Sequence, residues 1–443
     1  MNNKPKVEVV SKELLIPFIL ITSLFALWGF ANDITNPMVS AFKKVLELNN
    51  TQASWVQAAF YGGYFTMALP AAYIVKKYSY KTGIIVGLIL YAIGALLFYP
   101  AAANESYFFF LIALYILTFG LAFLETTANP FIMSMGDERT ATQRLNLAQA
   151  FNPIGALSGL LIAQTFILGA LQSDDLDANG NEIYSTLSET VKATVRTSDL
   201  MVIRNPYVAL GLFVLVMLVL ISIVKIPEQR TTKKGSTGML DSIKRIFRKE
   251  QFVGGVIAQM FYVGAQIMCW TYIYQYAENL GINNVDAVYY AYMALGIFLS
   301  GRFVFTFLLK YINSGKLLMI MSASAVAFTL GAIFINGMVG LYSLVMVSFS
   351  MSLMFPTIYG IALHGLGDDA KTGSAFLVMA IVGGAFMPIL QGMIMDIGGS
   401  GYSDTLILGV PEVNFSFILP AFSFVVVAFY GYRAFNKYSD NLE

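Results

Sequence analysis

Long apolar runs alternate with short polar stretches along the whole chain of 443 residues. Most of these runs reach the roughly 20 residues that a helix needs to cross a bilayer. The pattern predicts twelve membrane-spanning helices, with several residues of freedom at each edge. The expected spans are residues 14–42, 52–76, 83–102, 107–135, 146–170, 206–225, 252–278, 287–309, 316–336, 339–363, 372–396 and 412–433.

Composition agrees with an all-α integral membrane protein. Hydrophobic residues make up 57% of the chain, charged residues 12%, and the mean hydropathy is +0.68. Soluble proteins devote about a quarter of their residues to charge. The first apolar run lacks a small-residue cleavage pattern, so we expect it to be a retained membrane helix. One histidine and one cysteine argue against a zinc or thiol site, and we expect no metal and no cofactor.

The polar stretch 226–250 holds seven lysines and arginines against three acids. It divides the chain into an N-terminal half, residues 1–225, a linker, 226–250, and a C-terminal half, residues 251–443. In a chain of twelve spans, the basic loops lie on the same side of the membrane as the linker. The positive-inside rule therefore places this side, and with it both termini, in the cytoplasm. Two halves of six helices are the plan of the major facilitator fold, in which the halves are parallel repeats.

Two acids lie alone within apolar spans. Glu125 is the only charged residue between Tyr107 and Gly136, and Asp33 is the only one between Leu14 and Phe42. An intramembrane carboxylate is costly and usually functional, so we interpret both as proton-coupling residues. The alternatives are a structural ion pair for Glu125 and a hydrated acid near the outer mouth for Asp33.

Amide side chains recur near these acids. Gln149 and Asn152 are three residues apart, with Asn146 three residues earlier, and would share one face of a helix. Asn32, Asn36 and Pro37 lie beside Asp33 and indicate either an opened backbone or a polar wall. Amides both donate and accept hydrogen bonds, which suits a ligand made of hydroxyl groups. Hydrogen bonding between packed helices is the alternative role.

The seventh span carries a polar and aromatic stripe at helical spacing, formed by Gln259, Tyr262, Gln266, Trp270 and Tyr274. Hydrogen-bonding groups beside an aromatic face suit a sugar ring, although such stripes also serve in packing and in interfacial belts. Arg302 is the only charged residue in the eighth span, and we expect it to snorkel to the interface or to pair with a carboxylate. His364 falls in a short loop, where hydration is expected.

Several segments resemble the fucose/glucose-galactose/hexose permease family of bacteria. They are Leu124–Pro130, Arg144–Asn152, Tyr262–Gln266, Asn32–Ile34, Ser54–Tyr64, Tyr80–Ile85 and Phe355–Ile358. The resemblance covers nearly the whole chain in the right order. It implies that Asp33 and Glu125 carry protons and that Gln149 and Asn152 contact a sugar. The family's fucose carriers have tyrosine at the position of Phe355. This chain therefore lacks one hydroxyl group near the site.

From these features we expect proton-coupled symport of a monosaccharide, with L-fucose as the sugar. Glucose/galactose or N-acetylglucosamine symport with protons is the alternative within the family. More remote alternatives are a polytopic glycosyltransferase, using the acids around Asp174 and Asp175 in the expected loop 171–205, and a sugar receptor. The expected partners are a small sugar, protons and the lipid bilayer, with no nucleic acid. We expect a monomer in the bacterial inner membrane.

Overall fold

Helices that could cross a membrane dominate the structure. The computed structural model describes residues 9–35, 38–48, 50–174, 183–224, 238–282, 284–397 and 405–437. Within these residues, twelve helical spans are long and apolar enough to cross a bilayer. The predicted all-α class and number of spans are therefore confirmed.

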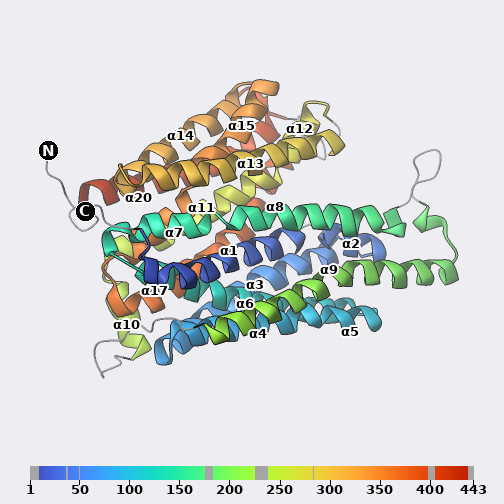
Figure 1. Ribbon diagram of the computed structural model, residues 1–443. Helices are drawn as coiled ribbons and strands as arrows, with labels where there is room; N and C mark the ends of the chain where they lie inside the picture. The colour runs from blue at the N-terminus through green and yellow to red at the C-terminus, as the bar shows by residue number, and fades with distance from the viewer. Residues whose placement is uncertain are drawn as a thin grey trace. The chain divides into compact units, whose positions relative to one another are not determined.

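Among its described residues, the first part of the chain forms nine α-helices, most of them labelled in Figure 1. They are α1 (Leu15–Thr35), α2 (Met38–Val45), α3 (Asn50–Lys77), α4 (Tyr80–Leu96), α5 (Phe98–Ala103), α6 (Tyr107–Ser134), α7 (Ala141–Gln149), α8 (Asn152–Ile162) and α9 (Glu189–Ile223). Short turns between them are η1 (Lys12–Leu14), η2 (Glu138–Thr140), the π-helical η3 (Ala163–Ile167), η4 (Leu168–Ala170), η5 (Gln172–Asp174) and η6 (Tyr184–Thr186).

The second part contains eleven α-helices among its described residues. They are α10 (Met239–Ile246), α11 (Glu250–Thr271), α12 (Ile273–Asn279), α13 (Asn284–Leu308), α14 (Ser314–Phe334), α15 (Met338–Met351), α16 (Met354–Leu363), α17 (Ala370–Met379), α18 (Gly383–Met395), α19 (Glu412–Ser416) and α20 (Ile418–Lys437). The 3₁₀ turns η7 (Gly367–Asp369) and η8 (Ala380–Val382) flank α17. A small antiparallel pair, β1 (Leu406–Ile407) and β2 (Val410–Pro411), precedes α19.

By their internal contacts, the helices form two compact units. The N-terminal unit comprises Ile19–Ala128 and Phe151–Glu228, and the C-terminal unit includes Gln229–Glu443. The segment Asn129–Ala150, here called the α6–α7 hairpin, groups with the C-terminal unit. The division at 225 and 250 expected from the sequence remains a prediction, and residues 225–237 of the linker lie outside the described residues.

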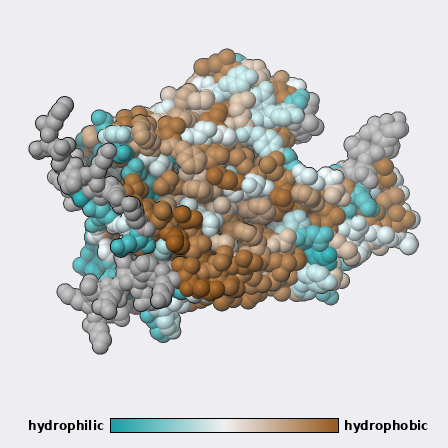
Figure 2. Space-filling model, viewed as in Figure 1, coloured by the Kyte–Doolittle hydropathy of each residue, from teal (hydrophilic) through white to brown (hydrophobic). Residues whose placement is uncertain are grey.

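Exposed apolar side chains cover the membrane-spanning helices. On α9, Leu212, Phe213 and Val216 are each more than half exposed, at 56%, 54% and 55%. Figure 2 shows hydrophobic residues gathered over α9 and the neighbouring α4. Large apolar side chains exposed in this way are stable only against lipid, as expected for a membrane protein.

Helix α9 begins much earlier than the sequence pattern indicated. We expected a span from residue 206 after a loop over 171–205, but the helix starts at Glu189. Its first turns are polar and project beyond the apolar part, where Lys192 pairs with Glu47 at 2.8 Å. The expectation was wrong because hydropathy reports only the membrane-embedded part of a helix.

Two spans are interrupted at a point where proline removes a backbone donor. Pro153 cannot donate to the carbonyl of Gln149, and the span breaks between α7 and α8. Pro356 likewise cannot donate to Ser352, and the break between α15 and α16 lies there. The continuous helix expected over 146–170 is therefore two helices, and Asn152 opens the second one.

Glycines let α1 and α8 approach backbone to backbone. A Cβ atom at Gly155 would collide with the backbone oxygen of Ala26, and one at Gly29 with the backbone oxygen of Asn152. Small residues at a crossing are the usual way in which membrane helices gain packing contacts. This crossing fixes α1 against α8 within the N-terminal unit.

Replacing Gly155 by alanine should therefore destabilise the protein. The added methyl group has no room, and overpacking costs about 1–3 kcal/mol. We expect the unfolding midpoint in detergent, followed by fluorescence-detected gel filtration, to fall by several degrees. Gly62→Ala is the matched control, because its Cβ would lie 3.6 Å from the ring of Tyr115, an ordinary contact. Equal midpoints for the two variants would contradict the crossing.

Candidate functional site

The two acids singled out in the sequence both lie in the N-terminal unit. Glu125 is on α6 and is 5% exposed, whereas Asp33 is half-buried near the end of α1. Helix α3 brings a tyrosine close to each acid, since Tyr61 lies within the electrostatic reach of Asp33 and Tyr64 within that of Glu125. The two tyrosines are three residues apart and so share a face of α3. One face of α3 thus carries a tyrosine near each carboxylate.

The amides near these acids differ in their bonding. The Asn32 Oδ1 atom is buried and has no hydrogen-bond partner among the described residues. Asn152 donates through Nδ2 to the backbone oxygen of Phe25 at 3.2 Å, across the α1–α8 crossing. This hydrogen bond joins α8 to α1 and does not use the Oδ1 atom of Asn152. The Oδ1 atom of Asn32 is an acceptor without a partner among the described residues.

Gln149 and Asn152 do not form the continuous polar face expected from their spacing. The helix is broken between them, at the step from α7 to α8. Gln149 is 3% exposed, belongs to the C-terminal unit and donates to the Asn129 Oδ1 atom at 2.9 Å. Its bonding partner is thus within the α6–α7 hairpin.

The stripe on α11 begins with a buried amide. Gln259 is fully buried, and neither its Nε2 nor its Oε1 atom has a partner among the described residues. One turn further, the Tyr262 hydroxyl donates to the backbone oxygen of Met351 at 3.1 Å. The ring of Tyr262 faces that of Phe355 edge-on, with centroids 6.4 Å apart. An unpartnered amide one helical turn from an aromatic ring is a combination that suits a sugar.

Gln266 and Trp270 lie farther along the same helix, as the spacing predicted, but Tyr274 does not, because α11 ends at Thr271 and Tyr274 belongs to α12. Gln266 is half-buried. Trp270 donates from Nε1 to the Ser348 Oγ atom at 3.1 Å, and its ring meets that of Phe298 at 5.1 Å. These contacts give Trp270 a packing role within the C-terminal unit and leave its contribution to a site as a prediction.

Arg302 is a functional candidate that the sequence reasoning undervalued. Its side chain neither snorkels nor pairs with a carboxylate among the described residues, since it is 3% exposed and its Nε and Nη1 atoms lack partners there. Its guanidinium lies 4.9 Å from the ring centre of Phe298 and within the electrostatic reach of Tyr262. Buried N–H donors without partners are suited to ligand oxygens. The sequence feature that could have identified this candidate is that Arg302 is the only charged residue in its apolar span.

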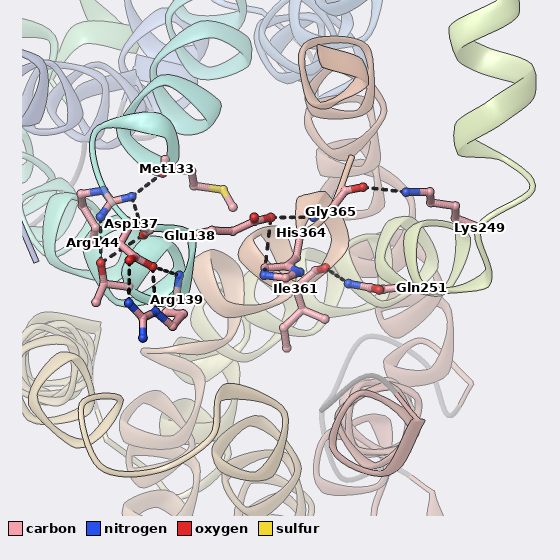
Figure 3. Close-up of polar contacts among 11 residues, drawn as sticks. Met133, Asp137, Glu138, Arg139, Arg144, Lys249, Gln251, Ile361, His364 and Gly365 are labelled. Carbon is pink, nitrogen blue, oxygen red and sulfur yellow. Dashed lines mark hydrogen bonds and ion pairs between the residues drawn. The ribbon is translucent and has the colours of Figure 1, made fainter. Parts of the chain in front are cut away.

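A second polar cluster joins the α6–α7 hairpin to the end of α16 (Figure 3). Glu138 accepts a hydrogen bond from the backbone N–H of Gly365 at 3.1 Å, and its carboxylate lies 3.6 Å from the His364 Nε2 atom. Lys249 donates to the backbone oxygen of Gly365 at 2.7 Å. The His364 side chain is 12% exposed, so the hydration expected for it was wrong. Burial lowers the pKa of His364, against the opposing effect of Glu138.

Arg144 holds the hairpin in shape. Its side chain is completely buried and donates to the backbone oxygens of Ile132, Val9 and Asp137 at 2.7, 2.9 and 3.3 Å. It also donates to Met133 and to the Thr140 hydroxyl group. A guanidinium with five donors can satisfy this many acceptors at once. The fixed hairpin presents Glu138 to α16.

Comparison with known proteins gives one consistent result. A family model of the Major Facilitator Superfamily matches residues 19–389. The L-fucose-proton symporter of Haemophilus influenzae is 54% identical over 427 residues, which cover 96% of this chain and 98% of that protein. The L-fucose-proton symporter of Escherichia coli is 36% identical over 424 residues, covering 94% and 92% of the two chains.

Solved structures agree with this relationship. A crystal structure of a Major Facilitator Superfamily transporter, FucP, in the outward conformation superimposes with a TM-score of 0.85 at 34% identity, covering 95% of this chain and 99% of that one. The resemblance inferred from the sequence motifs is confirmed. With twelve helical spans, a family match over most of its length and these relatives, the chain belongs to the Major Facilitator Superfamily.

Proposed function

We propose that the protein carries L-fucose together with a proton into a bacterial cell. The names of the Haemophilus and Escherichia relatives support both the sugar and the coupling ion. The observation that carries the proposal is the placement of two acids within apolar spans, Asp33 on α1 and Glu125 on α6, each near a tyrosine of α3. Membership of a transporter superfamily also argues against the glycosyltransferase alternative.

Protonation allows these acids to couple proton movement to sugar transport. A charged carboxylate in hydrocarbon is costly, and a proton removes that cost. A pH gradient drives sugar uphill only if the outward and inward conformations differ in proton affinity. We propose that Glu125 is protonated when sugar binds from outside and loses its proton to the cytoplasm, and that Asp33 assists this transfer. An unprotonated, sugar-free carrier must resist reorientation, which prevents a proton leak.

In this proposal, the sugar is bound by polar atoms that lack hydrogen-bond partners within the described part of the protein. Asn32 in the N-terminal unit and Gln259 in the C-terminal unit keep unpaired atoms among the described residues, and so does Arg302. Gln149, Asn152 and the rings of the α11 stripe complete the set of candidates. Phe355 in place of tyrosine makes its surroundings less polar, which suits the methyl group of a 6-deoxy sugar such as L-fucose.

The cluster around Glu138 is proposed to close the cytoplasmic end. The predicted topology places the α6–α7 hairpin, His364 and Lys249 on that side. While Glu138 holds Gly365, the hairpin from the first half of the sequence stays joined to α16 from the second half. Release of sugar to the cytoplasm would require this contact to separate.

Orientation and assembly complete the proposal. Both termini lie in the cytoplasm, and the protein resides in the inner membrane. One chain acts alone, because a single copy supplies both acids and every sugar-binding candidate.

Glu125→Gln should uncouple the protein. The amide imitates the protonated acid, so we expect L-fucose exchange at equal concentrations to survive while accumulation driven by a pH gradient is lost. Both are measured with radiolabelled L-fucose in vesicles containing the purified protein. Glu278→Gln, at an exposed acid on α12, should leave both activities unchanged. Normal accumulation by the Glu125 variant would rule out its coupling role.

Gln259→Leu should weaken sugar binding without weakening the fold. If the amide bonds sugar hydroxyl groups, its loss should cost about 1–3 kcal/mol of affinity, while stability stays or rises because a buried unpartnered group is gone. Tryptophan fluorescence with L-fucose, D-galactose, D-glucose and N-acetylglucosamine gives the affinities. Asn146→Leu is the stability control, since Asn146 donates to Thr142 and Thr357. Tighter binding of glucose or N-acetylglucosamine by the natural protein would refute L-fucose as substrate.

A covalent cross-link between positions 138 and 364 should stop transport. With Cys269, the only cysteine in the chain, changed to serine, cysteines at positions 138 and 364 can be linked by a short cleavable thiol reagent. We expect L-fucose exchange to stop on linking and to return on cleavage. The single variant His364→Cys, treated identically, should keep transporting. Unimpaired exchange by the linked protein would mean that this contact need not separate.

A further inference from the structure

A groove opens on the surface of the N-terminal unit, and its lining includes none of the acids or sugar-binding candidates. It has a volume of about 730 Å³ and lies among α1, α8 with η3, and α9. Ser23 and Phe30 contribute from α1, Ser158 from α8, and Asn205, Ala209 and Met217 from α9. Its volume is in the range of sites that hold drug-sized ligands, about 300–1,000 Å³.

The groove opens toward the bilayer. Three of its lining residues, Ile154, Phe166 and Phe213, are 39%, 59% and 54% exposed, and all three belong to membrane spans. Lipid is the medium around such residues, and a dry apolar groove offers little to water. An apolar chain is therefore the occupant that its lining favours.

The position of the groove along α9 matches one leaflet. From Pro206 to Ile223 the helix carries no charged residue, and this length is about 27 Å, close to the roughly 30 Å thickness of the hydrocarbon core. Asn205 thus lies at one boundary of the core. The lining residues Asn205 and Met217 are about 18 Å apart along the helix, slightly more than the depth of one leaflet, about 15 Å.

A cation without an acidic partner lies at this boundary. Arg204 donates from Nε and Nη2 to the Asn205 Oδ1 atom, at 3.2 and 3.0 Å, and Asn205 lines the groove. Its guanidinium also lies 4.7 Å from the ring centre of Tyr99. In the described part of the chain it forms no ion pair with a carboxylate. A guanidinium with free donors at headgroup depth is complementary to a phosphate.

We propose that the groove binds one acyl chain of a phospholipid, whose phosphate is held at the membrane boundary by Arg204. The chain lies between α1 and α8 on one side and α9 on the other, and extends from Asn205 toward the middle of the bilayer. The site is distinct from the sugar-binding candidates and does not depend on the proposed transport function. It makes a lipid molecule part of the packing of the N-terminal unit.

Native mass spectrometry of the purified protein tests this site. Delipidated protein is titrated with phosphatidylglycerol and with phosphatidylethanolamine, and bound lipid is counted. We expect one lipid to bind well before any other. Ala209→Trp fills the groove and should weaken this first binding at least tenfold. Leu212→Trp, on the same helix at a 56% exposed position that does not line the groove, should bind as the natural protein does.

To test whether Arg204 binds the phosphate, a lipid without phosphate is used for comparison. Arg204→Gln should weaken phospholipid binding about tenfold, the size of a lost charge-assisted hydrogen bond, and Arg204→Lys should recover most of it. Diacylglycerol, which has the same chains and no phosphate, should bind the natural protein and Arg204→Gln equally. If Ala209→Trp does not fold, Ser158→Phe fills the groove from α8. First-site binding unaffected by the groove-filling variants, or by Arg204→Gln, would overturn the proposal.

Discussion

A polar group that enters hydrocarbon must find a partner, and this requirement governs the structure. Arg144 meets it completely, because four backbone oxygens and one hydroxyl group accept its donors. Asn32, Gln259 and Arg302 do not meet it among the described residues. Each unpartnered buried atom costs about 1–3 kcal/mol. Such a cost is tolerated where a ligand supplies the missing partner, which is why these three residues are candidates for binding the proposed sugar.

The sequence was most informative where one physical effect dominates. Apolar length alone sets a membrane span, so the twelve spans were predictable. A lone carboxylate in such a span, as at Glu125, is conspicuous for the same reason. The stripe on α11 was predictable because that helix continues without interruption from Gln259 to Trp270.

Prediction was less successful where the outcome depends on residues that are distant in the sequence. The break between Gln149 and Asn152 follows from Pro153, yet proline in a membrane helix does not always break it, and Pro70 lies within the continuous α3. His364 was expected to be hydrated because it falls in a short loop, and the pattern could not reveal its partner Glu138, more than two hundred residues away. The long polar start of α9 was missed because hydropathy does not register helix outside the membrane.

The boundaries of the α6–α7 hairpin have a mechanical consequence. One boundary falls between Ala128 and Asn129, next to Pro130, and the other between Ala150 and Phe151, next to Pro153. Each lacks one backbone hydrogen bond, and helices bend most easily at such points. Both ends of the hairpin thus lie close to a proline, where bending a helix costs least. Collective helix motions of this kind take microseconds to milliseconds. Bending at these two prolines would therefore be a microsecond-to-millisecond event, far slower than the rotation of a side chain.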